Sequence, residues 1–236
     1  MNLWYKFQRA SALLLLISLL PLLAVLWLLV KATSRGPFLY SQLRPGMEGK
    51  PIRTWKIRTM RPGADRNSDL ARCVTQDCPE VTSIGKVLRQ LKLDELPQLW
   101  NIVMGEMAFV GPRPIATSLY NELCERIEGF EERTSVRPGL SNVAQVAIDE
   151  NGEGENLLKD WKERFEAEKH YLRLRSVPYD LIVICLTLLY IGRKSVRLIC
   201  SKTKSLANLI RSCLAAPQFQ RETSTRNASS YSKSCS

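Results

Sequence analysis

The sequence predicts a mostly helical α+β protein with an N-terminal membrane anchor, a main domain and surface amphipathic helices. Three observations predict this class: an uncharged apolar run over 10–30, helical spacing of apolar residues over 84–104 and 157–191, and a strand-like stretch over 52–60. We expect three parts: an N-terminal membrane anchor over 1–35, a main domain over 36–190, and a basic amphipathic segment with a disordered tail over 191–236.

The overall composition averages two unlike ends of the chain. With 236 residues, a net charge of +11 and a mean hydropathy of -0.14, the chain has the composition of a soluble domain. Residues 191–236, however, hold nine basic residues and one acidic residue, and so carry +8 of that charge. A basic segment on a chain with a membrane-length apolar run favours contact with anionic membrane lipid. We expect no nucleic-acid partner, because no aromatic-interleaved basic strand accompanies the charge.

The apolar run over 10–30 matches a membrane in length, since a helix of this size covers roughly 30 Å. The sequence disfavours a cleaved signal peptide, because Trp27-Leu28-Leu29-Val30 runs straight into Lys31 without a small-residue cleavage site. Basic residues flank both ends, which favours keeping both ends in the cytoplasm (Lys6, Arg9, Lys31, Arg35). Pro21 lies near the middle and forces a kink. Two interpretations remain open on the residues alone: a re-entrant hairpin and a kinked spanning helix.

The segment after the anchor is rich in Gly and Pro over 34–50, which indicates extended chain and a turn before the strand over 52–60. Cys73 and Cys78 follow in a polar stretch. No second cysteine pair accompanies them, and the single histidine of the chain is the distant His170, so we expect reduced thiols and no metal site there.

Helical patterns cover most of the remaining chain. Apolar residues recur at helical spacing over 84–93 and 96–104, and we expect further helices over 115–133 and 157–175. The apolar run over 179–191 is too short to cross a bilayer and indicates a core or interfacial helix, continued to about 214 by a membrane-surface helix. A stretch over 136–148 that contains a Pro-Gly turn, followed by an acidic loop over 149–155, separates the helices predicted over 115–133 and 157–175.

Asp94 and Glu95 form an acidic dyad at a predicted helix start, with Asp94 as the N-cap and Pro97 in the first turn. Adjacent carboxylates at such a place have two uses. They can cap free backbone N–H groups, or they can bind a divalent metal and attack an electrophile while the helix dipole stabilises their charge.

Basic residues near the dyad favour the chemical use. Arg113 lies between two prolines, so a rigid turn presents its guanidinium, which suits phosphate recognition. Lys56, Arg58 and Arg89 add cationic groups of the kind that surrounds a diphosphate.

These residues resemble the bacterial sugar transferases, also called monotopic phosphoglycosyl transferases or undecaprenyl-phosphate sugar-1-phosphate transferases. The resemblance covers about 10–190 and rests on several motifs in the same order along the chain. They are the block over 93–114, Lys56-Ile57-Arg58-Thr59-Met60, Gln42-x-Arg44-x-Gly46-x-x-Gly49, Ile84-Gly85-Lys86-x-Leu88-Arg89 and Ser135-Val136-Arg137-Pro138-Gly139.

The resemblance implies transfer of a sugar 1-phosphate from a UDP-sugar to undecaprenyl phosphate with Mg²⁺, releasing UMP and starting a lipid-linked glycan. Such glycans include exopolysaccharide, capsule, the O-antigen of lipopolysaccharide and glycoprotein glycans. It implies that Asp94 is the nucleophile of a covalent phosphosugar intermediate and that Glu95 takes part in metal binding. Arg113 is associated with the nucleotide-sugar, and Lys56, Arg58, Arg89 and Gln145 are the other candidate substrate-binding residues.

The resemblance also implies a re-entrant anchor on the cytoplasmic face of the bacterial inner membrane. The chain departs from the family pattern at two places. Leu20 precedes the breaking Pro21 where a Ser is common, leaving Ser18 to bond a freed carbonyl. After Gly139, the usual Thr-Gly-Trp-Ala-Gln is replaced by Ser141-Asn142-Val143-Ala144-Gln145, which retains Gln145.

A second hypothesis from another class is a catalytically weak membrane-bound scaffold. In this interpretation the basic tail over 191–236 binds anionic lipid or partner proteins, and no nucleotide-sugar is turned over. Nothing in the sequence indicates the sugar or the oligomeric state.

Overall fold

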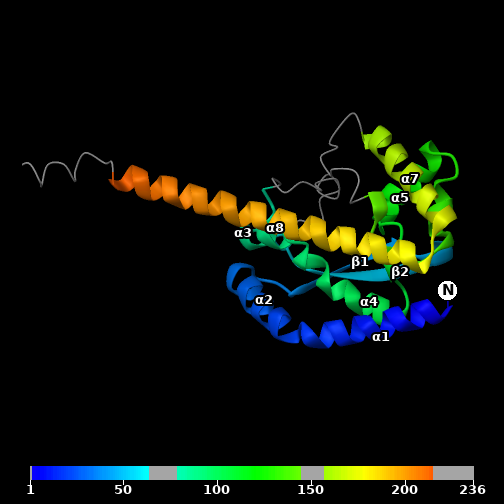
Figure 1. Cartoon of the computed structure of the whole chain (residues 1–236), viewed down its shortest axis with the longest axis horizontal. Helices are drawn as coiled ribbons and strands as arrows, with labels where there is room; N and C mark the ends of the chain where they lie inside the picture. The colour runs from blue at the N-terminus through cyan, green and yellow to red at the C-terminus, as the bar shows by residue number, and fades with distance from the viewer. Residues whose placement is uncertain (1, 64–78, 145–156, 215–236) are drawn as a thin grey trace, which may run out of the picture. The chain divides into compact units, whose positions relative to one another are not determined.

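The computed structural model describes residues 2–63, 79–144 and 157–214, and the side chains of the last range from 158 to 197 (Figure 1). The chain divides into two units, Met1–Ile191 and Gly192–Ser236. The elements described below lie in the first unit, except that helix α8 (Val177–Leu214) begins there and continues into the second. Several predicted features lie outside the described residues: the Cys73 and Cys78 pair, Gln145, the acidic loop over 149–155 and the tail from 215.

The N-terminal apolar region forms two helices, α1 (Asn2–Ser18) and α2 (Leu20–Thr33), which meet at a bend of 58°. Among the described residues, none of the helices is by itself long and apolar enough to cross a membrane, whereas this bent pair together meets both criteria. The break falls at Leu19, two residues before Pro21, because Pro21 sits in the first turn of α2 where a missing N–H costs no helical hydrogen bond. Ser18 donates its hydroxyl to the Leu15 carbonyl at 2.8 Å. The expectation that Ser18 bonds a freed carbonyl is wrong, because the Leu15 carbonyl already accepts the Leu19 N–H at 3.0 Å.

Two small sheets confirm the α+β class. Strand β1 (Leu39–Pro45) pairs antiparallel with β2 (Pro51–Ile57), with Leu39 opposite Ile57. A short 3₁₀ helix, η1 (Met47–Gly49), closes the hairpin. Strand β3 (Ala108–Val110) pairs in parallel with β4 (Gly139–Ser141). Gly139 permits this pairing because a Cβ there would lie 2.1 Å from the backbone nitrogen of Gly111.

Helices make up most of the remaining structure. They are α3 (Ser83–Gln90), the 3₁₀ helix η3 (Leu93–Gln98), α4 (Leu99–Met104), α5 (Thr117–Arg126), the 3₁₀ helix η4 (Phe130–Ser135), α7 (Leu157–Leu174) and α8 (Val177–Leu214). The single helix predicted over 115–133 is therefore wrong in its second half, because Gly129 at φ 72° interrupts it before η4. Helix α4 lies between α1 and the β1–β2 hairpin (Figure 1).

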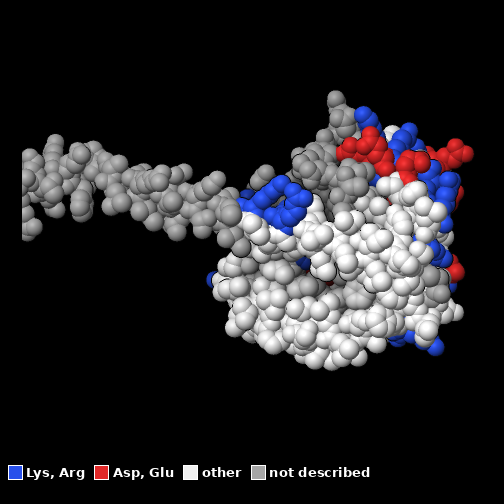
Figure 2. Space-filling view, viewed as in Figure 1, with Lys and Arg blue, Asp and Glu red and all other residues white. Residues whose placement is uncertain are grey.

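The two N-terminal helices contribute one face to the core. Ala12 packs with Leu99 and Ile102 of α4, while Leu26 and Val30 pack with residues of β2 and α3. Large apolar side chains on the opposite face are exposed to solvent; Leu14, Leu20 and Leu28 expose 71%, 55% and 60% of their surface. Figure 2 shows a largely uncharged surface over α2 and the C-terminal part of α1, with basic side chains at the start of α1, while acidic and basic side chains gather over α5 and α7.

Candidate active site

The acidic dyad lies inside the first turn of η3, and both carboxylates are buried. The prediction that Asp94 is the N-cap is wrong, because Lys92 occupies that position in the left-handed conformation at φ 56°. This turn at Lys92 separates η3 from α3 and starts the helix before the dyad. The prediction that the dyad lies at the start of a helix is confirmed, because Asp94 and Glu95 are in the first turn of η3.

Glu95 accepts hydrogen bonds from two cationic side chains that come from different elements. Lys56 Nζ on β2 lies 2.9 Å from Glu95 Oε1. Arg113, in the Pro-Arg-Pro turn, places Nη2 at 2.7 Å from Oε1 and Nη1 at 3.4 Å from Oε2. One buried carboxylate therefore joins β2, η3 and the turn after β3.

The two neighbouring carboxyl groups have opposite ionisation preferences. Burial raises the pKa of Asp94, and the Glu95 charge adds to the effect, although nearby Lys56 opposes both. Burial alone would also raise the pKa of Glu95, but Arg113 and Lys56 together hold it well below its usual range. Glu95 is thus a fixed negative charge, whereas Asp94 is a carboxyl whose ionised form is only partly stabilised.

Arg44 on β1 is a site residue to which the sequence assigned no role. Its guanidinium donates to the Pro114 carbonyl and, at 3.1 Å, to Gln42 Oε1, while its buried Nε has no hydrogen-bond partner among the described residues. Burial and the neighbouring Arg113 lower the pKa of Arg44 to about 10. The sequence signal was its place in the Gln42-x-Arg44 motif, but only the hairpin brings it beside Arg113.

The site holds more positive charge than the single firmly ionised carboxylate, Glu95, can balance. Lys56, Arg113 and Arg44 all act on Glu95, and burial lowers the pKa of Lys56 while Arg44 and Arg113 lower it further. Partly buried cations are stabilised by anionic partners. The arrangement therefore suits a ligand with several negative oxygens, such as a phosphate or a diphosphate.

The other predicted substrate-binding residues differ in how close they come to the dyad. Arg89 on α3 donates to Thr59 Oγ1 at 2.9 Å and acts electrostatically on Asp94. Arg58 donates to the Pro37 carbonyl at 3.0 Å and lies over the Tyr40 ring, so the contacts described for it do not reach the dyad.

Asn101 on α4 is a second residue that sequence reasoning missed, and it fixes the strand that carries Lys56. It is fully buried and donates to the Arg53 carbonyl and to Glu106 Oε2, each at 2.7 Å. Its Oδ1 accepts from the Trp55 backbone N–H at 3.3 Å. The only sequence signal was an amide within an otherwise apolar helix.

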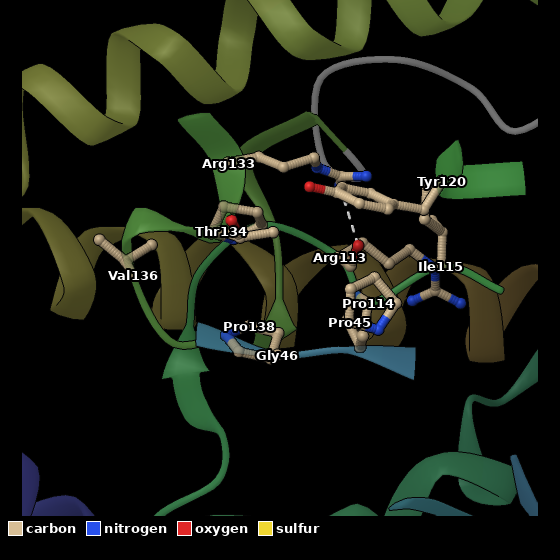
Figure 3. A pocket seen from close by; sticks show the side chains of 11 residues that line it. Pro45, Gly46, Arg113, Pro114, Ile115, Tyr120, Arg133, Thr134, Val136 and Pro138 are labelled. Carbon is tan, nitrogen blue, oxygen red and sulfur yellow. Dashed lines mark hydrogen bonds between the residues drawn. The ribbon is translucent and has the colours of Figure 1, made fainter. Parts of the chain in front are cut away.

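A small pocket lies behind the Pro-Arg-Pro turn, with Tyr120, Arg133 and Thr134 in its wall (Figure 3). Its volume is about 10 Å³, which is room for about one water molecule. It is therefore too small for a nucleotide, and it lies against the turn that carries Arg113.

The donor set of the dyad fits one kind of metal site. Within the described parts of the chain, no three His, Cys, Asp or Glu side chains gather into a closed metal site. Mg²⁺ commonly uses only one or two carboxylates and takes its other ligands from water and substrate phosphates. Asp94 and Glu95 match that open type, and the surrounding cations suit the phosphates.

Comparison with known proteins identifies the same family that the sequence motifs resemble. The bacterial sugar transferase family model matches residues 4–194. The chain is 41% identical over 180 residues to UDP-glucose:undecaprenyl-phosphate glucose-1-phosphate transferase of Klebsiella pneumoniae, covering 75% of this chain and 37% of the relative. It is 36% identical over 196 residues to the exopolysaccharide production protein ExoY of Sinorhizobium fredii, covering 78% of this chain and 82% of the relative.

The chain belongs to the bacterial sugar transferase family. It spans little more than a third of the length of the Klebsiella relative, and also of the undecaprenyl-phosphate glucose phosphotransferase of Komagataeibacter xylinus, to which it is 37% identical (34% of that relative covered).

Proposed function

We propose that this chain transfers a sugar 1-phosphate from a UDP-sugar to undecaprenyl phosphate and thereby starts a lipid-linked glycan such as an exopolysaccharide. The observation that carries the proposal is the buried Glu95 held by Lys56 and Arg113 directly beside Asp94. The names of the relatives support the substrate classes, and UDP-glucose is the first nucleotide-sugar to test.

The reaction is a double displacement at one phosphorus atom. An Asp94 carboxylate oxygen attacks the phosphorus that carries the sugar, the bond to the UMP oxygen breaks, and UMP leaves with its electron pair. A phosphate oxygen of undecaprenyl phosphate then attacks the same phosphorus and releases Asp94. This order lets a soluble nucleotide leave before a lipid phosphate enters the site.

The residues around Asp94 have separate roles in this proposal. Arg113, Lys56 and Arg44 bind the diphosphate oxygens and stabilise the charge that collects on departing UMP. Glu95 holds two of these cations in place. Arg89 lowers the cost of ionising Asp94. Gln145 and Arg58 remain candidate substrate contacts from the sequence.

Mg²⁺ is the proposed cofactor, with Asp94 and Glu95 as the residues that would hold it. When bound, it supplies positive charge that offsets the diphosphate. Glu95 has both oxygens engaged by Lys56 and Arg113, so binding requires at least one of these bonds to lengthen.

We also propose that α1 and α2 enter and leave the cytoplasmic face of the bacterial inner membrane. Both ends of the pair are held by the same domain: Trp4 donates to Asp180 at 2.7 Å, Arg9 to the Val103 carbonyl at 2.8 Å, and Val30 packs against Ile57. A spanning segment would place its ends roughly 30 Å apart across the hydrocarbon. The exposed apolar face of the bent pair supplies the surface for lipid.

The activity test is UMP release by the purified chain with undecaprenyl phosphate, Mg²⁺ and a panel of UDP-sugars. We expect turnover with at least one sugar, and loss of it in Asp94→Asn and Glu95→Gln. Full activity in Asp94→Asn would rule out the covalent mechanism. Membrane binding without turnover of any sugar would instead favour the scaffold hypothesis.

The topology test uses an Asn2→Cys variant whose native cysteines are replaced by serine. We expect an impermeant thiol reagent to label it from the cytoplasmic side only. Labelling from the periplasmic side would show that the pair spans the membrane.

A further inference from the structure

A second buried ion pair lies behind Arg113, on the side away from the dyad. Glu168 on α7 and Arg133 on η4 are both buried. Arg133 Nε lies 3.0 Å from Glu168 Oε2, and its Nη2 lies 2.9 Å from Oε1. Two parallel bonds fix the relative orientation of the two groups, as in other bidentate arginine–carboxylate pairs.

This pair holds the backbone of the Pro-Arg-Pro turn at both of its polar groups. Arg133 Nη2 donates to the Arg113 carbonyl at 2.9 Å, the bond drawn in Figure 3. The Arg113 N–H points to Glu168 Oε1 at 3.4 Å. Because prolines 112 and 114 have no N–H, the Arg113 amide is the only backbone donor of the turn.

Asn142 joins the same carboxylate from the segment after β4. Its Nδ2 donates to Glu168 Oε1 at 2.6 Å, and its Oδ1 accepts from the Ala144 N–H at 2.7 Å. Asn142 occupies the glycine position of the Thr-Gly-Trp-Ala-Gln pattern that this chain lacks. A glycine has no side chain to make either bond, so this contact is specific to the sequence found here.

We propose that Arg133, Glu168 and Asn142 are positioning residues that set where the Arg113 guanidinium lies against Glu95 and, through it, the affinity for the nucleotide diphosphate. The proposal rests on the proposed function for the identity of the ligand. Both faces of one residue are involved: its backbone is held by Glu168 and Arg133, while its side chain reaches Glu95 at 2.7 Å. Displacement of the turn therefore displaces the guanidinium.

The alternative is that these residues only stabilise the fold, as buried pairs commonly do. The two roles differ in what they change. Lost stability lowers the melting temperature and the fraction of active protein, but leaves the affinity of the folded molecules for nucleotide unchanged. Lost positioning weakens nucleotide binding by the folded molecules.

The experiment measures the Kd of UDP by calorimetry for the full chain and its Asn142→Ala and Glu168→Gln variants, together with their melting temperatures. We expect the Kd to rise about threefold to tenfold in Asn142→Ala and more in Glu168→Gln, the size expected for the loss of one buried hydrogen bond or one charge. Leu26→Ala is the control, since Leu26 is buried in a separate cluster with Val30, Ile57 and Leu88, whereas the rings around Phe165 lie against Arg133. It should lower the melting temperature without changing the Kd.

A double-mutant cycle identifies the route of the effect. In an Arg113→Gln background, Asn142→Ala should no longer change the Kd, because its effect passes through Arg113. An unchanged Kd in both single variants, or an equal effect with and without Arg113, would overturn the proposal. So would a full chain that does not bind UDP. A chain that binds UDP but releases no UMP would contradict the transferase function, while the Kd comparison would still decide the role of these residues.

Discussion

Replacing the two dyad carboxylates by their amides should move the melting temperature in opposite directions. Glu95→Gln removes the charge that Lys56 and Arg113 share and leaves two partly buried cations facing a neutral amide. Asp94→Asn removes a carboxyl whose ionised form burial disfavours, and the amide carries no such cost. Both substitutions keep the shape of the side chain, so charge is the main variable.

The size of the Glu95→Gln effect follows from the exposure of its partners. Lys56 and Arg113 keep 20% and 24% of their side-chain surface exposed, so water relieves part of the uncompensated charge. We therefore take the lower end of the range for breaking a buried ion pair, about 3 kcal/mol. For a chain of this size that loss corresponds to a fall of about 6–12 °C in melting temperature. Asp94→Asn should raise the melting temperature at neutral pH.

The assay is differential scanning calorimetry of the purified full chain and both variants in one detergent at pH 7.5, without nucleotide or Mg²⁺. UMP release is measured on the same preparations. We expect both variants to be inactive, so that activity and stability separate in Asp94→Asn. A similar fall in both melting temperatures would refute the assignment of opposite ionisation preferences to the dyad.

Three further predictions concern the frame of the site and its pH dependence. Asn101→Ala should lower the free energy of unfolding by about 2–4 kcal/mol, measured by denaturant titration, because two backbone groups of β2 and the Glu106 carboxylate after α4 lose their bonds to this buried amide. Gly85→Ala should cost about 1–3 kcal/mol in the same titration, since its Cβ would lie 2.1 Å from the Thr59 carbonyl oxygen. Gly192→Ala, which meets nothing within 4 Å, is the neutral or stabilising control. The acid limb of UMP release should fall above pH 3.8, the ordinary pKa of Asp, because Asp94 must lose a proton whose pKa is raised; a limb at or below that value would contradict its role as the nucleophile.

The same shifts fix how stability depends on pH. Glu95 has a lowered pKa in the folded chain, so its contribution is present above the unfolded value of 4.5 and is lost as the pH falls through the folded pKa. Asp94 has a raised pKa, so its contribution is present below 3.8 and is lost as the pH rises through the folded pKa. Glu95→Gln should therefore show a shallower loss of stability on acidification than the unmodified chain.

The sequence predicted the helical segments of the fold better than its strands. The spacing over 84–104 located α3, η3 and α4, because amphipathic periodicity reflects burial directly. Strand β1 was predicted only as extended chain, since its Gly- and Pro-rich surroundings indicate a turn. Its strand character comes from pairing with β2, which is a tertiary property.

For the site, the sequence identified several of the individual residues but could not show that they lie close together in the fold. Lys56, Glu95 and Arg113 were all named from the sequence, and the structure brings them together across 57 positions of the chain. Arg44 and Asn101 were not assigned roles, because their importance depends on which elements meet. No pattern within β1 or α4 alone shows that a neighbouring turn lies within hydrogen-bonding distance.

The packing of α1 on α4 has a mechanical consequence for a chain that works on a lipid substrate. Helix α4 directly follows the dyad along the chain, and α1 is bonded to the domain through Trp4, Gln8 and Arg9. If α1 and α2 lie in the bilayer as proposed, this continuous packing fixes the distance of Asp94 from the membrane surface, since no flexible linker separates the two. The phosphate of the carrier lipid would then have to rise to a constant level, so shifting α1 by one turn would misplace the nucleophile without touching it.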